Sequence, residues 1–292
     1  EAVKLMRGPR GTKILIRILR KGWSTPRLFL IVRDAIQVPS VALHLVEPNL
    51  PYVRLTQFQE RTARDLDEML SAVEGPIRGL VLDLRDNPGG LLDQAVKVAD
   101  LFLDDGLIVF TKGRGEGNRM EWHAHTNGTQ QPYPVVVLVN GGSASASEIV
   151  AGSLQDHRRA LLVGTETFGK GSVQTIIPLD DGSGLRLTTA LYYLPSGRSI
   201  QEVRIQPDIT IEPFSEAQLK ALMEEEGDGV TTRLGEEHLP GHLSSETEPE
   251  EEPVDRDQDF ADRMERDRQL TRALDLLKSW NVFSELEGSE GT

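Results

Sequence analysis

Two short stretches of the sequence each place a reactive side chain among small residues. Residues 140–148 read Asn-Gly-Gly-Ser-Ala-Ser-Ala-Ser-Glu, and residues 167–174 read Thr-Phe-Gly-Lys-Gly-Ser-Val-Gln. A serine hydroxyl becomes a nucleophile when a nearby base takes its proton, and a lysine shielded from water can be that base. The two stretches together therefore indicate a hydrolase that works through a serine and a lysine.

Three serines of the first stretch, Ser143, Ser145 and Ser147, are candidates for the nucleophile. Ser145 is favoured because it stands where a predicted strand and a Gly-Gly turn lead into a predicted helix over residues 146–154. The alternative is that these serines only cap that helix, since serine is a preferred N-cap residue. The sequence leaves both interpretations open.

The start of this helix also suggests how negative charge would be stabilised. The first amides of a helix lack partners and carry partial positive charge, so they can hold a developing oxyanion. The Ala146 N–H is the natural first donor. Gly90 is the best candidate for the second donor, because Gly89-Gly90 also follows a predicted strand and glycine allows the backbone to come close.

The base is either a histidine or Lys170. His157 lies 12 residues beyond Ser145, which along a continuous helix is about 18 Å and too far for proton transfer. His123 and His125 could flank a metal, but an exposed pair is the simpler interpretation. Lys170 is flanked by uncharged residues that would shield it from water, and desolvation favours the neutral amine. Gln174 could orient that amine by a hydrogen bond.

A competing motif overlaps the lysine. Residues 164–170 match the first seven places of a phosphate-binding P-loop. The eighth place requires Ser or Thr, and this chain has Gly171 there. The residues that follow also predict a strand, where a P-loop requires a helix. Nucleotide binding is therefore disfavoured.

The surrounding pattern predicts the elements that must position these loops. Strands and helices alternate from residue 41 to residue 213, which favours an α/β fold with a largely parallel, covered sheet. The expected strands are residues 52–57, 78–84, 107–111, 135–139 and 160–163, the expected helices are residues 60–73, 91–103 and 146–154, and a hairpin is expected over 173–179 and 184–194. In such sheets functional loops follow the carboxyl ends of strands, and both stretches do so.

Composition narrows the class of protein. The chain has 292 residues, no cysteine and a net charge of −14, which excludes disulfides and Cys-bound metals. Residues 214–292 hold 22 acidic and 8 basic side chains, whereas residues 1–213 are balanced. An acidic tail repels nucleic acid, so it is either a solvated linker or a docking segment. No apolar run is long enough to span a bilayer.

These motifs resemble those of the carboxyl-terminal processing peptidases, the tail-specific proteases of serine peptidase family S41. Residues 83–90, Asp-Leu-Arg-Asp-Asn-Pro-Gly-Gly, are a third matching block and residues 155–160 a weaker fourth. The resemblance implies a crotonase/Clp-protease-like core and no metal or cofactor. It implies Ser145 as nucleophile, Lys170 as general base, Gln174 as the residue that holds the lysine, and an oxyanion hole formed by the amides of Gly90 and Ala146.

The resemblance also suggests a domain plan. Residues 1–37 resemble the C-terminal half of a PDZ domain, residues 38–213 the catalytic core, and residues 214–292 form an acidic linker followed by a docking helix predicted over 260–278. The chain opens at Glu1, as expected of a fragment or a processed form. Protein substrates with accessible C-termini, contact with an adaptor or a second copy through the tail, and a periplasmic or other extracytoplasmic location are implied.

Two other functions fit parts of the sequence. A catalytically silent peptide-binding scaffold would explain the partial PDZ segment and the acidic tail, but it has no need of a serine facing a lysine. An acyl-CoA enzyme on the same crotonase-like fold would use the oxyanion hole without a Ser/Lys pair. A serine peptidase is therefore the favoured function.

Overall fold

The computed structural model describes residues 2–20, 23–34, 38–113, 119–126, 133–214 and 266–289. It divides into two compact units, Glu1–Pro39 and Ser40–Thr292. The first unit has a short helix and two antiparallel strands, α1 (Ala2–Met6), β1 (Lys13–Ile18) and β2 (Arg27–Val32).

The second unit is built on a six-stranded sheet with the order β12-β9-β8-β5-β4-β3. Its strands are β3 (Val41–Glu47), β4 (Leu50–Leu55), β5 (Leu80–Asp83), β8 (Val135–Val139), β9 (Ala160–Gly164) and β12 (Ile209–Thr210). All neighbours are parallel except β3 and β4, which pair antiparallel. The predicted mixed α/β fold with a largely parallel sheet is confirmed, although β3 and β12 were not expected.

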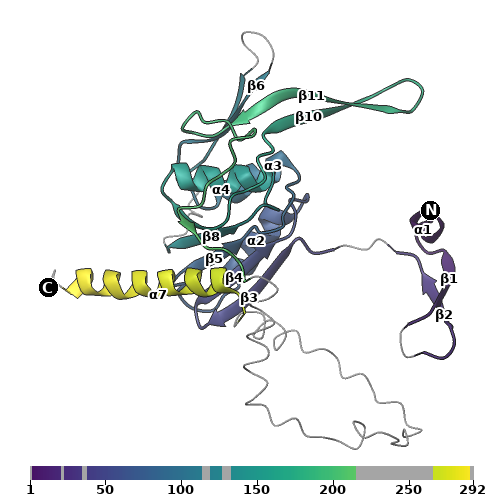
Figure 1. Cartoon of the computed structure of the whole chain (residues 1–292), viewed down its shortest axis with the longest axis horizontal. Helices are drawn as coiled ribbons and strands as arrows, with labels where there is room; N and C mark the ends of the chain where they lie inside the picture. The colour runs from purple at the N-terminus through teal and green to yellow at the C-terminus, as the bar shows by residue number, and fades with distance from the viewer. Residues whose placement is uncertain are drawn as a thin grey trace, which may run out of the picture. The chain divides into compact units, whose positions relative to one another are not determined.

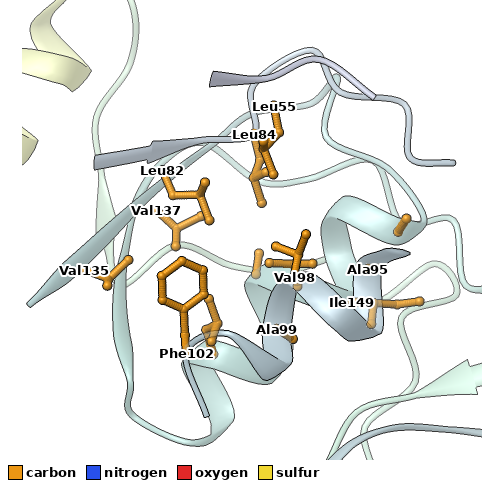
Figure 2. Packing of buried hydrophobic residues seen from close by; sticks show 14 of the residues in the cluster. Leu55, Leu82, Leu84, Ala95, Val98, Ala99, Phe102, Val135, Val137 and Ile149 are labelled. Carbon is orange, nitrogen blue, oxygen red and sulfur yellow. The ribbon is translucent and has the colours of Figure 1, made fainter. Parts of the chain in front are cut away.

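Three helices cover one face of this sheet: α2 (Thr62–Ser71), α3 (Leu92–Asp100) and α4 (Ala146–Asp156). Figure 2 shows side chains of β5 and β8, including Leu82 and Val137, facing Val98 and Phe102 of the α3 region. These side chains are fully or almost fully buried. The apolar residues of α3 recur at helical spacing because only one side of the helix meets the sheet.

The opposite face of the sheet is covered by α7 (Arg268–Ser289), which Figure 1 shows running alongside β5 and β8. Leu270, Ala273 and Leu277 are buried against this face. The helix was expected over residues 260–278, and it continues eleven residues further to Ser289. Among the described residues it begins at Arg268, and in its extension past Lys278 both Trp280 and Phe283 are exposed. The acidic linker predicted within 215–265 lies outside the described residues.

A network of charged side chains fastens the start of α7 to the end of β5. Arg85 Nη2 lies 2.6 Å from a carboxylate oxygen of Asp83 and 2.6 Å from one of Asp267. Asp267 also accepts hydrogen bonds from the N–H groups of Gln269 and Leu270, as an N-cap residue does. Burial disfavours the charge of Arg85, but the hydrogen bonds to the two carboxylates outweigh this and raise the pKa of Arg85.

Replacing Asp267 with alanine is expected to lower the free energy of unfolding by about 2–3 kcal/mol. The change removes a helix cap and one of the two carboxylates that neutralise the mostly buried Arg85. Urea unfolding measures the effect. The matched variant Asp275→Ala changes an exposed residue of the same helix and should cost less than about 0.5 kcal/mol. Equal losses in the two variants would contradict the role given to Asp267.

The second sheet is antiparallel, with the order β10-β11-β6-β7. Its strands are β6 (Leu107–Gly113), β7 (Arg119–His123), β10 (Ser172–Pro178) and β11 (Gly184–Tyr193). The predicted β10–β11 hairpin is confirmed, and Figure 1 shows it projecting from the second unit. β10 is a terminal strand of its sheet. In the described ranges, no helix combines the length and apolar character needed to cross a bilayer.

Candidate active site

Three loops meet at one edge of the parallel sheet because the strands before them are neighbours. The strand order places β8 between β9 and β5. The loop after β8 carries Ser145, the loop after β5 carries Gly90, and the loop after β9 carries Lys170. The carboxyl ends of adjacent parallel strands lie together, which is the usual place for a site in an open α/β sheet. The fold therefore brings the three predicted parts of the site together.

Ser145 stands at a sharp turn between β8 and α4. Its backbone has φ 57° and ψ −112°, in a region that costs a non-glycine residue roughly 1–3 kcal/mol. A strained serine between a strand and a helix is the geometry that presents a nucleophile at the mouth of an α/β site. The Ser145 residue is half-buried.

The other two candidate serines have structural roles. Ser143 and Ser147 are fully buried. The Ser143 hydroxyl donates to the carbonyl of Leu84 at 2.8 Å, and the Ser147 hydroxyl donates to the carbonyl of Asn87 at 2.9 Å. Both hydroxyls tie the turn to the neighbouring loop, which leaves Ser145 as the serine that a substrate could reach.

The Gly89-Gly90 backbone lies directly against this turn. A Cβ on Gly89 would lie 2.7 Å from the Ala144 carbonyl oxygen and 2.9 Å from the Ala146 nitrogen. The hydrogen bonds of this loop to Phe58 use the Gly89 carbonyl and the N–H of the residue after Gly90. Within the part of the chain that the structure describes, neither the Gly90 N–H nor the Ala146 N–H donates a hydrogen bond. Both predicted oxyanion donors are therefore available.

Asn87 fixes the shape of the glycine loop, and its role was not foreseen from the sequence. Its side-chain amide donates to the Leu55 carbonyl and accepts from the Gly89 N–H, both at 2.9 Å. Its carbonyl accepts hydrogen bonds from the Ala144 N–H and the Ser147 hydroxyl. A buried Asn before Pro-Gly-Gly is a signal for such a turn, since asparagine side chains bond nearby backbone groups.

A buried carboxylate joins the serine loop to the lysine loop. Glu148 is fully buried on the first turn of α4. Its Oε2 accepts from the N–H of Ser145 at 2.8 Å and from the N–H of Lys170 at 2.9 Å. Its Oε1 accepts from the Thr167 hydroxyl at 2.5 Å and from the Gly169 N–H at 2.7 Å. Through these contacts Glu148 organises the site as well as standing at the start of the helix.

Lys170 is half-buried in the loop that Glu148 holds. Among the described carboxylates, none forms an ion pair with its ammonium group. Gln174 is exposed on β10, where its Oε1 accepts a hydrogen bond of 2.7 Å from Arg186 Nε. No hydrogen bond joins Gln174 to Lys170 in this arrangement of the described residues. An orienting role for Gln174 requires its side chain to leave Arg186 and remains a prediction.

The described histidines lie outside this site. His157 bonds the carbonyl of Leu107 at 2.8 Å through Nε2 and so ties α4 to β6. His123 pairs with Glu121 on the exposed strand β7, where the bond from His123 is the main cause that lowers the pKa of Glu121. In the portion of the chain that is described, no cluster of three His, Asp or Glu side chains could hold a metal ion.

Comparison with known proteins agrees with this geometry. Residues 49–211, more than half of the chain, match the model of peptidase family S41. The chain belongs to peptidase family S41. The three loops of the site all lie inside the matched range, so the resemblance inferred from residues 83–90, 140–148 and 167–174 is confirmed.

Members of family S41 from bacteria are similar over most of this chain. A carboxy-terminal-processing protease of Bartonella bacilliformis is 50% identical over 253 residues, which cover 85% of this chain and 56% of the relative. A carboxyl-terminal-processing protease of Synechocystis is 40% identical over 217 residues, which cover 73% and 50%. The chain thus spans about half the length of the curated relatives that it matches.

A solved structure of a C-terminal processing protease has a similar fold. The photosystem II D1 C-terminal processing protease is 33% identical and superposes with a TM-score of 0.55. The match covers 70% of this chain and 57% of that protein. It therefore supports the assignment of the mixed α/β unit to the peptidase family.

Proposed function

We propose that this chain carries the catalytic centre of a serine endopeptidase in which Ser145 is the nucleophile and Lys170 the general base. The observation that carries the proposal is the shared Glu148 oxygen, which accepts from the N–H groups of both residues. Because each nitrogen lies within hydrogen-bond distance of the same atom, the two nitrogens are within about 6 Å of each other. A lysine side chain can bridge that gap to a serine hydroxyl.

The proposed reaction proceeds through an acyl-enzyme. The neutral amine of Lys170 takes the hydroxyl proton as Ser145 Oγ attacks the scissile carbonyl carbon, and the N–H groups of Gly90 and Ala146 stabilise the oxyanion. When the C–N bond breaks, Lys170 returns the proton to the leaving amine. Water, deprotonated by Lys170, then hydrolyses the ester and restores the serine. Gln174, once released from Arg186, would hold the amine in line.

The substrate would bind as an added strand on β10. This strand starts at Ser172, two residues after Lys170, and is a terminal strand of its sheet. An extended peptide pairing with such an edge gains backbone hydrogen bonds that do not depend on its sequence. The same edge leads the peptide past the lysine loop and toward Ser145.

The names of the relatives, carboxy-terminal-processing proteases, suggest the substrate class. We assign to this chain the cleavage of protein substrates near their C-termini, in the periplasm or another extracytoplasmic compartment. Its catalytic unit is of the crotonase/Clp-protease type, and its first unit is the C-terminal part of a PDZ domain. The C-terminal tail would contact an adaptor or a second copy of the chain.

C-terminal processing can be tested with a matched pair of substrates. One is a folded reporter protein that ends in an unstructured, uncharged tail, and the other carries a second folded domain after the same tail. Intact-mass spectrometry is expected to show the first reporter shortened only from its C-terminal end, while the second stays intact for longer. Equal cleavage of both reporters would refute recognition of the C-terminus, even if it showed peptidase activity.

A further inference from the structure

A second loop, formed by residues 200–205, holds the lysine loop from another direction. We propose that Gln201 in this loop is a positioning residue for Lys170, a role that rests on the proposed function of the lysine as base. Gln201 follows Lys170 by 31 positions and belongs to none of the motifs that suggested a peptidase. It does not touch substrate in this proposal and acts only through the placement of the lysine.

The two residues next to Lys170 are both bonded to this loop. The Gly171 N–H donates to Gln201 Oε1 at 3.1 Å. The Gly169 carbonyl accepts from the N–H of Glu202 at 3.0 Å. Consecutive residues of one loop thus hold the backbone on both sides of the base.

The holding loop is itself fixed in the core. Ile200 and Ile205, at its two ends, are fully buried. Between them Glu202 has φ 63° and Arg204 has φ 61°, a left-handed conformation that non-glycine residues seldom adopt. Strain of this kind persists only where the surroundings enforce it, and it gathers at functional sites. Here it directs the Glu202 N–H at Gly169.

Gly171 packs against the loop too closely for any other residue. A Cβ at this position would lie 2.3 Å from the Gln201 nitrogen. The backbone of Gly171 therefore lies against the backbone of Gln201. This places the Gln201 side chain beside the Gly171 N–H. This explains why Gly171 occupies the place where a P-loop would have Ser or Thr.

Glu148 and Gln201 together hold the lysine loop from two sides. Glu148 accepts the N–H groups of Gly169 and Lys170, and Gln201 accepts that of Gly171. Loss of Gln201 leaves the Glu148 contacts in place, so the fold survives while the residue after the base is freed. The defect should then show in the chemical step and little in stability.

Several charged groups lie around the lysine loop, and they determine how an added charge would act on the Lys170 amine. Glu148 lies buried on α4, and Glu202 is exposed on the holding loop. Glu166 forms an ion pair of 2.8 Å with Arg204, and hydrogen bonds from Gln206 and then Arg204 lower the pKa of Glu166. A carboxylate at position 201 would add one negative charge next to Lys170 and favour its protonated form.

The first test is the variant Gln201→Met in the full chain, assayed with a fluorogenic peptide. Methionine keeps the length of the side chain and removes the acceptor. We expect kcat to fall about tenfold, the effect of one lost hydrogen bond in the placement of a reacting group, with KM within about twofold and little change in Tm. The control Gln155→Met removes a half-buried glutamine that bonds Gln206 and Asp208 away from the site. It should lower Tm and leave kcat unchanged.

The second test is Gln201→Glu, which keeps an acceptor for Gly171 and therefore folds even if the methionine variant does not. The acidic limb of the pH profile of kcat/KM should move up by about 0.5–1 pH unit, because the base must lose its proton beside a new negative charge. The shift tests whether the side chain at position 201 lies close enough to the Lys170 amine for its charge to act on it, which the positioning role requires.

The outcomes separate this inference from the proposed function. The role of Gln201 is overturned if Gln201→Met keeps the wild-type kcat, or if the acidic limb does not move in Gln201→Glu. In either case an inactive Lys170→Ala leaves the proposed function standing. Full activity in Lys170→Ala overturns both. A tenfold fall in kcat together with the shifted limb supports the positioning role.

Discussion

Replacing either Ser145 or Lys170 with alanine is expected to abolish peptide hydrolysis, with kcat falling by at least about 10⁴-fold in each variant. Ser145→Ala removes the atom that forms the acyl bond, and Lys170→Ala removes the group that takes the serine proton. Because the two act as a unit, the double variant should be no less active than either single one. Initial rates with a fluorogenic peptide measure the effect.

The variant Lys170→Arg sharpens this prediction. Arginine keeps a positive charge at the position but does not lose its proton in proteins, so it cannot act as a base. It should be as inactive as Lys170→Ala if the lysine is the base, and should retain activity if the lysine only attracts an acidic group of the substrate. The controls Ser279→Ala and Lys97→Ala change exposed residues of α7 and α3 and should keep wild-type rates.

Replacing Glu148 is expected to have the largest effect on the fold among the residues around the site. Its carboxylate accepts four hydrogen bonds from two separate loops in a fully buried position. Glu148→Ala leaves those donors without a partner, and each unsatisfied buried donor costs about 1–3 kcal/mol. Allowing for relaxation, we expect the free energy of unfolding to fall by about 3–5 kcal/mol and peptide hydrolysis to fall below detection.

Glu148→Gln tests whether the carboxylate itself is required. Glutamine has the same shape, but its one oxygen can serve only one pair of donors, and its NH₂ group would point at the other pair. A loss of at least about 2 kcal/mol is therefore expected in urea unfolding. Glu68→Gln, at an exposed position on α2 that pairs with Arg64, should cost under about 0.5 kcal/mol. If Glu148→Gln were as stable as the wild type, the role of Glu148 in joining the serine loop to the lysine loop would be refuted.

The parts of the site were predictable from sequence, because each part obeys a local rule. Apolar runs followed by Gly-rich turns and amphipathic segments predicted three strand–loop–helix or strand–loop–strand junctions. The helix start at Ala146 and the loop at Gly89-Gly90 were placed correctly. Strand order is set by packing of whole elements, and no local pattern states that β8 lies between β9 and β5. The meeting of the three loops therefore became visible only in the fold.

Contacts between residues far apart in the sequence could not be predicted either, because no local pattern specifies them. Arg85 bonds Asp267 across 182 positions, and Gly171 bonds Gln201 across 30. Neither pair has a spacing that marks it in the sequence. The strands β3 and β7 were also missed. β7 has the sequence Arg-Met-Glu-Trp-His, and its polar–apolar alternation extends over only five residues, which is near the lower limit at which a strand is recognised.

The most direct measurement is covalent labelling of the full chain with a fluorophosphonate, followed by peptide mapping. An activated serine reacts with this reagent and an ordinary one does not. The wild type is predicted to carry one adduct, on Ser145, over a long incubation, and Lys170→Ala is predicted to carry none. No adduct on Ser145 in a wild type that cleaves peptides, or equal labelling in Lys170→Ala, would contradict a serine activated by this lysine.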